Sequence, residues 1–161
     1  MAEEFRGLLR IRQQLTEEEC LQILKTEKRG VLSVLGDNGY PYGMPMNHYY
    51  SEADGKLYFH GGRKGHKIDA LRRCEKVSFC VMDQGVRQEG EWFLRVRSVI
   101  VFGRIEFVDD LQKTEEISRL LSYKFTRDEE YISGEIRKDG PRTQLLALVP
   151  EHMTGKTVQE R

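Results

Sequence analysis

The chain has 161 residues, with 26 basic and 26 acidic side chains and a formal net charge of zero. A protein without a global positive field is a poor general binder of nucleic acid or of anionic membranes, so any basic site must be a local patch. The length suits one domain over residues 1–161, large enough to fold without a disulfide or a structural metal.

Three observations predict a cytoplasmic protein that does not cross a membrane. No apolar run approaches the roughly 18 to 20 residues needed to span a bilayer. The N-terminus carries Glu3 and Glu4 and lacks the apolar core of a secretory signal. The cysteines (Cys20, Cys74 and Cys80) are odd in number and lack CxxC spacing, which indicates free thiols in a reducing compartment.

The first half of the chain predicts one helix followed by strands joined by tight turns. A capping-box spacing begins the helix predicted over 16–28. A β-branched run at 31–35 predicts a strand, and the Gly-Asp-Asn-Gly sequence at 36–39 predicts a hairpin turn. The returning segment 40–50 contains two prolines, which fit an edge or bulged strand, and a third strand is expected at 56–60.

The second half predicts three more strands and three helices. In chain order these are a short helix 68–73, a strand 76–82, a polar loop 83–91, a strand 92–108 with Gly103 as a bulge, helices 111–125 and 128–138, a strand 144–149 and a polar tail from Glu151. Consecutive strands with helices at the two ends indicate an antiparallel sheet or barrel and not a βαβ alternation.

Segment 60–67 predicts an anion site. Its glycines let the backbone approach a ligand, and Arg63, Lys64, His66 and Lys67 fall at the start of a short helix. Cations there are unfavourable by about 0.3–1 kcal/mol each, because the helix macrodipole is positive at that end. A bound phosphate would remove the conflict. The alternative is a solvated basic turn, and the glycine spacing matches neither a P-loop nor a Rossmann motif.

Segment 40–50 predicts a site for a planar ring. Its four tyrosines and two prolines make a stiff, irregular strand whose backbone groups are only partly used by a ladder. The alternative is a bulged edge strand whose aromatic side chains cover the core. The histidines lack zinc-ligand spacing, so no metal site is expected and each is interpreted as a hydrogen-bonded strand or loop residue.

Several stretches resemble, in order and spacing, one known superfamily. They are GVLSV (30–34), GYPYGMP (39–45), LYFHG (57–61), GHKID (65–69), KVSF (76–79) and RSVIVFG (97–103). The chain is similar in these stretches to the pyridoxamine 5'-phosphate oxidase-like, FMN-binding split-barrel superfamily, and within it to the nitroimidazole-reductase-like branch. The stretch HMTGK (152–156) is similar to the C-terminal signature of that branch.

The resemblance implies a fold, a cofactor and a set of binding residues. The fold is mainly β with peripheral helices, a six-stranded antiparallel split β-barrel that forms a homodimer with FMN at the interface. The implied ring contacts are the backbone of Met46, Asn47, His48 and Tyr49, with Phe59, His60 and Gly61 on the neighbouring strand, and Ser98 on the pyrimidine side. The implied phosphate contacts are Arg63, Lys64 and Lys67, His66 is a further cofactor-binding residue of this turn, and Trp92 and Lys156 are further candidates.

The resemblance also implies a flavin-dependent oxidoreductase, with nitroreductase-like electron transfer from NAD(P)H to a small acceptor. The tail lacks the Arg-x-His substrate motif of genuine pyridoxamine phosphate oxidases, so vitamin B6 oxidation is not expected. No catalytic residue is assigned, although His48 and His60 are candidate proton donors. The alternatives are a non-enzymatic flavin-binding or redox-sensing module, a split barrel that uses deazaflavin or haem, and a structural dimer with an empty groove.

Overall fold

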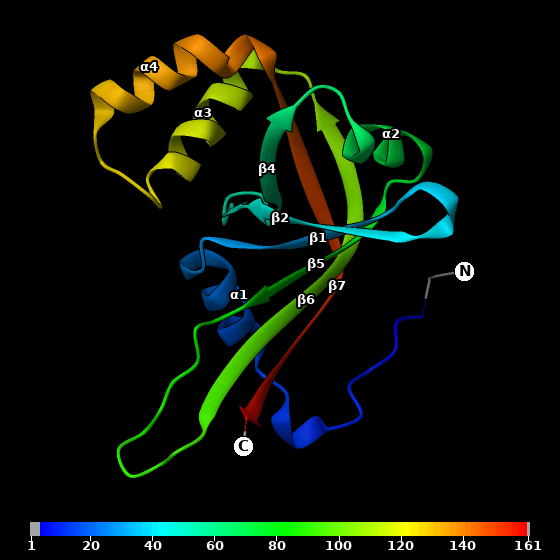
Figure 1. Ribbon diagram of the computed structural model, residues 1–161, viewed down its shortest axis with the longest axis vertical. Coiled ribbons are helices and arrows are strands. Elements are labelled where there is room, and N and C mark those ends of the chain that lie inside the picture. The colour runs from blue at the N-terminus through cyan, green and yellow to red at the C-terminus, as the bar shows by residue number, and fades with distance from the viewer. Residues whose placement is uncertain (1–3, 161) are drawn as a thin grey trace.

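A computed structural model describes residues 4–160 as one antiparallel sheet with helices around it (Figure 1). The helices are α1 (Glu17–Thr26), α2 (His66–Arg73), α3 (Leu111–Ser122) and α4 (Glu129–Asp139), with 3-10 turns at Ile11–Gln13, Asp37–Gly39 and Gly140–Arg142. The strands are β1 (Arg29–Leu35), β2 (Pro41–Asn47), β3 (Tyr49–Tyr50), β4 (Leu57–Gly62), β5 (Lys76–Met82), β6 (Leu94–Val108) and β7 (Thr143–Glu160).

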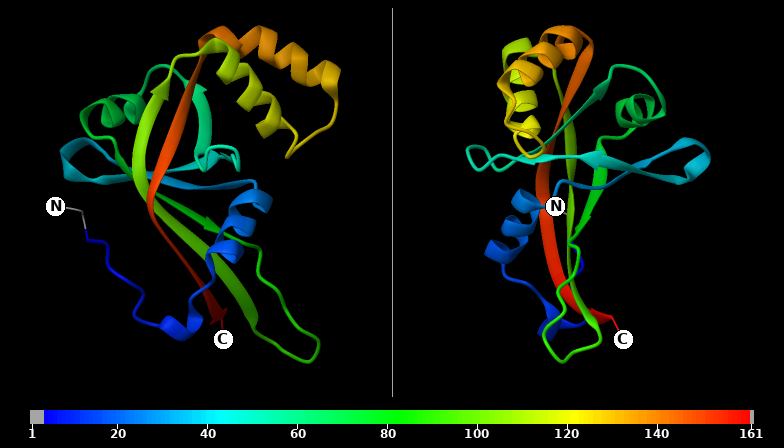
Figure 2. Two further views of the ribbon diagram at one scale, coloured as in Figure 1. Left: turned by 180° about the vertical axis from the view of Figure 1, so that it is seen from behind. Right: turned by 60° about the vertical axis from the view of Figure 1, so that its left-hand side comes forward.

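The sheet has seven strands in the order β2-β1-β5-β6-β7-β4-β3. The long strands β6 and β7 pair along their whole length and form its centre. α1 and α2 lie on opposite sides of this pair, and α3 with α4 cover one end (Figure 2). The predicted fold class, a mainly β antiparallel split barrel, is therefore confirmed.

The predicted bulge at Gly103 is also confirmed, because the β6–β7 register shifts between Phe102 and Gly103. A Cβ added at Gly103 would lie 2.2 Å from the carbonyl oxygen of Val149. Only glycine permits this close approach of the two strands.

The strand count differs from the expected six because the chain bends at His48. The ring of His48 turns into the core and hydrogen-bonds the carbonyl of Leu24 at 2.8 Å. The segment predicted as one returning strand is therefore divided into β2 and β3, which lie at the two opposite edges of the sheet.

The C-terminal tail is a second correction. It was expected to be a polar tail from Glu151, but β7 continues to Glu160 by pairing with residues 94–102 of β6. Gly155 is buried there, and a Cβ added to it would lie 2.4 Å from Sγ of Cys20 on α1. The tail is thus part of the surface on which α1 packs.

The core lies in two clusters. The larger one joins α1 and α2 to the inner face of the sheet, with Phe59 and Phe79 in edge-to-face contact at 4.9 Å. The smaller one joins β4 and β7 to α3 through Tyr58, Ile117 and Leu145. The starts of α1, α3 and α4 agree with the sequence, and α1 has the predicted capping box, whereas α2 begins at His66, two residues before the predicted helix. Among the helices of residues 4–160, none has the length and apolar character that a membrane crossing requires.

Candidate functional site

The barrel is open between β2 and β4, and we call the facing edges of these strands the split (residues 41–47 of β2 and 59–62 of β4). β2 is the last strand at one edge of the sheet. β4 pairs with β3 only at Tyr58 and Leu57, so residues 59–62 have no strand partner on that side. Unpaired strand edges present free N–H and C=O groups, so both walls of the split offer backbone hydrogen bonds.

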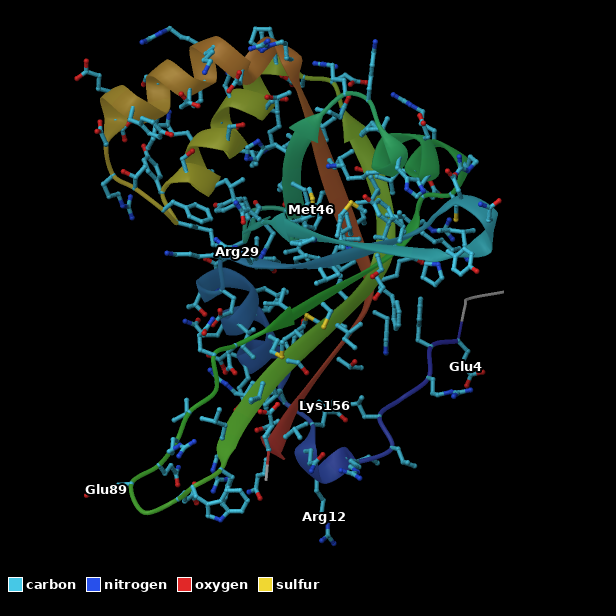
Figure 3. The ribbon with its side chains drawn as sticks, viewed as in Figure 1. Glu4, Arg12, Arg29, Met46, Glu89 and Lys156 are labelled. Carbon is cyan, nitrogen blue, oxygen red and sulfur yellow. The ribbon has the colours of Figure 1, made fainter. Side chains whose placement is uncertain are left out.

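Lys67 bridges the two walls of the split. Its Nζ lies 3.8 Å from Sδ of Met46 on β2, and a Cβ added at Gly61 of β4 would lie 2.8 Å from the same nitrogen. Figure 3 shows Met46 on the side of β2 that faces β4. Burial lowers the pKa of Lys67, and no carboxylate among residues 4–160 pairs with it. This ammonium therefore favours an anionic or electron-rich ligand in the split.

The turn from β4 to α2 places more positive charge beside Lys67. Arg63 and Lys64 are exposed on this turn, and Gly65 caps α2 with φ 121° and no side-chain hydrogen bond. The N–H groups of the first turn of α2 are thus left without a side-chain acceptor. The arrangement has the parts that a phosphate site at a helix N-terminus needs.

Two of the residues implied by the resemblance have side chains that the core encloses. Phe59 and His48 are fully buried, so only their backbone atoms face the split. Burial and the nearby charge of Lys124 lower the pKa of His48 to about 4. His48 is therefore neutral near pH 7, and its Nδ1 is buried without a hydrogen-bond partner in the described chain.

His66 is held by the β1–β2 turn. Its Nε2 accepts a hydrogen bond from the Asp37 N–H at 3.1 Å, and its ring stacks on Tyr42 with centroids 4.1 Å apart. Arg73 pairs with the same Asp37 at 2.7 Å. The β1–β2 turn thus fixes the start of α2. The His66 side chain is directed to the β1–β2 turn and less to the split, so its main role is to hold the basic turn of residues 63–65 in place.

The side chain of His60 points away from the split. Residues alternate along β4, so His60 shares a face with Tyr58, which packs against α3, and Gly61 shares the inner face with Phe59. Asn47, at the end of β2, accepts a hydrogen bond from Nε of Arg29 at 3.3 Å. The half-buried Tyr49 instead lines a hollow of about 310 Å³ between β3 and α3.

Ser98 is not part of the same wall. It lies on β6, and β1 and β5 stand between that strand and β2. Its cross-strand neighbour is Lys156 on β7, and Trp92 is exposed just before β6 (Figure 3 labels Lys156). One chain thus brings together Met46, Gly61 and Lys67, and leaves Ser98 on another part of the sheet.

Lys124 is a residue that the sequence did not reveal. Its Nζ donates to the carbonyls of Glu27 at 2.6 Å and His48 at 2.8 Å, and burial lowers its pKa to about 8. It ties the end of α1 to the bend between β2 and β3. No spacing signal could have found it, because its partners are backbone atoms far away in the sequence.

Comparison with known proteins identifies the family. The sequence pattern described as pyridoxamine 5'-phosphate oxidase matches residues 16–157. The chain belongs to the pyridoxamine 5'-phosphate oxidase family. No curated protein matches the sequence.

Solved structures share the fold of this family member. A proposed 5-nitroimidazole antibiotic resistance protein from Bacteroides thetaiotaomicron is 22% identical, with a TM-score of 0.74 over 91% of this chain and 87% of that one. An FAD-binding protein from Mesorhizobium loti is 23% identical, with a TM-score of 0.65 over 91% and 97%. An FAD- and haem-binding protein from Mycobacterium smegmatis is 21% identical, with a TM-score of 0.70 over 89% and 72%.

Proposed function

We propose that this family member is a homodimeric flavoprotein that binds FMN in the split and transfers electrons from a nicotinamide donor to a small acceptor. The observation that carries the proposal is the pair of unpaired strand edges bridged by the ammonium of Lys67. The FAD-binding proteins among the structural neighbours support a flavin as the ligand.

The residues of the split fit a flavin nucleotide. The free edges of residues 46–47 of β2 and 59–61 of β4 offer hydrogen bonds to the rim of a planar ring, and the lack of a side chain at Gly61 lets Nζ of Lys67 lie against the strand. Arg63, Lys64 and Lys67 would hold the phosphate at the start of α2. When bound, the flavin supplies the hydride or electron transfer, and the protein supplies position and charge.

A second copy of the chain would complete the site. The outer face of β1 and β5 exposes apolar side chains, with Val31 43%, Leu35 51% and Met82 61% accessible. Ser98 lies on this face as well, as the cross-strand partner of Met82. A dimer formed through this face would bury these side chains and bring Ser98 towards the split of the partner.

The first experiment is the visible spectrum and mass of the ligand that copurifies with the protein. FMN, deazaflavin and haem have distinct spectra, so a haem or deazaflavin spectrum would replace the flavin proposal. Turnover with NADH or NADPH and nitroaromatic or quinone acceptors then separates an enzyme from a module that only binds flavin.

The phosphate assignment is tested with the double variant Arg63→Ala, Lys67→Met. Each lost charge-assisted hydrogen bond is worth about 1.5–3 kcal/mol, so FMN affinity should fall at least about 100-fold. Lys138→Ala, an exposed cation on α4, is the matched control. A folded double variant with unchanged FMN affinity would show that the phosphate lies elsewhere.

A further inference from the structure

The connection between α3 and α4 brings one ammonium group to the bend between β2 and β3. Lys124 lies in a tight turn just after α3, and its backbone N–H donates to the carbonyl of Leu121 at 3.1 Å. Figure 1 shows this end of α3 beside the end of α1. The half-buried side chain reaches from the turn to the bend, where its Nζ donates to the carbonyls of Glu27 at 2.6 Å and His48 at 2.8 Å.

The backbone at His48 lies outside the ladders of both neighbouring strands. β2 pairs with β1 up to Asn47, and β3 begins to pair with β4 at Tyr49. The N–H of His48 donates to the carbonyl of Lys28 over a long distance of 3.4 Å. The shorter, charge-assisted bond from Lys124 is therefore the stronger main-chain contact that holds the peptide at this position.

Two other lysines near the end of α1 are engaged elsewhere. Lys28 lies over the ring of Phe125 with its Nζ 5.4 Å from the centroid, and Lys25 pairs with Glu52. Since removing an ammonium from water costs free energy, the two bonds of Lys124 must offset that cost. These bonds determine the direction of the peptide group at the bend, directly after the last residues of the β2 wall of the split.

We propose that Lys124 is a positioning residue of the split, because it holds the peptide at His48 so that Met46 and Asn47 keep their free edge turned towards β4. A peptide group is planar and rotates as a unit, so the peptide that follows a strand end also constrains the direction of that end. Without the ammonium, the edge at Met46 and Asn47 loses its defined direction. That this edge contacts the ring of a flavin rests on the proposed function.

The first measurement compares the affinity of the full chain for FMN and for riboflavin by quenching of flavin fluorescence. Riboflavin lacks the phosphate, so a defect at the ring weakens both ligands, whereas a defect at the basic turn weakens only FMN. Lys124→Met should weaken both about tenfold, which corresponds to the loss of one neutral hydrogen bond. Arg63→Ala should weaken FMN alone. The control Lys25→Met removes a cation from the same hollow between β3 and α3 and should weaken neither.

The second measurement is amide relaxation by NMR on the ligand-free proteins, which reports the motion of the native state and not its stability. We expect order parameters of residues 46–48 to fall from roughly 0.85 towards about 0.6 in Lys124→Met and to stay unchanged in Lys25→Met. Lys124→Arg, which can donate to both carbonyls, should recover most of the flavin affinity. Lys124→Gln, with a polar side chain one atom shorter, replaces Lys124→Met if that variant does not fold, and the same results are expected.

The two measurements separate this inference from the proposed function. Unchanged order parameters at residues 46–48, unchanged affinity for riboflavin, or an equal loss of affinity in Lys25→Met would overturn the positioning role of Lys124. A wild-type protein that binds neither flavin would refute the proposed function, whereas lower order parameters in Lys124→Met would still support the hold of Lys124 on the edge of β2.

Discussion

His48 makes the stability of this protein depend on pH in a way that can be calculated. Its ring is fully buried, donates through Nε2 to the Leu24 carbonyl, and has a pKa of about 4 instead of 6.5. The unfolded chain therefore binds a proton between these values that the folded chain does not. Because the folded pKa is the lower one, stability falls as the pH falls through this window.

The linkage relation predicts that the free energy of unfolding falls by about 2 kcal/mol between about pH 7.5 and pH 5, and by about 3 kcal/mol by pH 4. The variant His48→Gln keeps an N–H donor for Leu24 and has no group that titrates. Urea unfolding of both proteins at the two pH values measures the effect, and His66→Gln is the control for the loss of a histidine from a partly exposed site. The reasoning is refuted if the wild type and His48→Gln lose the same stability on acidification.

Three further predictions concern the fold. Gly103→Ala forces a Cβ against the Val149 carbonyl, so it should lower the free energy of unfolding by more than about 3 kcal/mol or abolish soluble expression. The control Gly134→Ala lies in open space on α4 and should raise the free energy of unfolding by up to about 1 kcal/mol, measured by thermal unfolding. Thr16→Ala removes the capping box of α1 and should cost about 1 kcal/mol by urea unfolding, and an unchanged midpoint would contradict the role of the cap. Because the pKa of Lys124 is lowered to about 8, wild-type stability should rise from about pH 8 towards pH 10.5 relative to Lys124→Met, and a constant difference between the two would disprove this.

The sequence predicts elements that local chemistry determines. The capping box at Thr16, the turn at 36–39 and the bulge at Gly103 each depend on a few neighbouring residues, and all three are present. The prolines of segment 40–50 place β2 correctly at an edge of the sheet.

The features that the sequence does not reveal depend on contacts between distant segments. β7 continues past Glu151 only because β6 supplies a partner strand for the polar tail. The direction of the His60 side chain follows from the pairing of β4 with β7 and from the position of α3. The resemblance does not indicate that His48 and Phe59 turn their side chains into the core.

The bend between β2 and β3 links stability to the proposed site. A continuous strand would have formed an ordinary hairpin, and the split would have lacked one of its walls. The bend is instead held by two groups that are unfavourable to bury, the His48 ring with its unpartnered Nδ1 and the Lys124 ammonium. Both bond to backbone carbonyls at the end of α1 or at the bend itself, where no neighbouring strand supplies donors. These hydrogen bonds fix the direction of the carbonyls at the bend, which a hydrophobic packing of the same segment would not do.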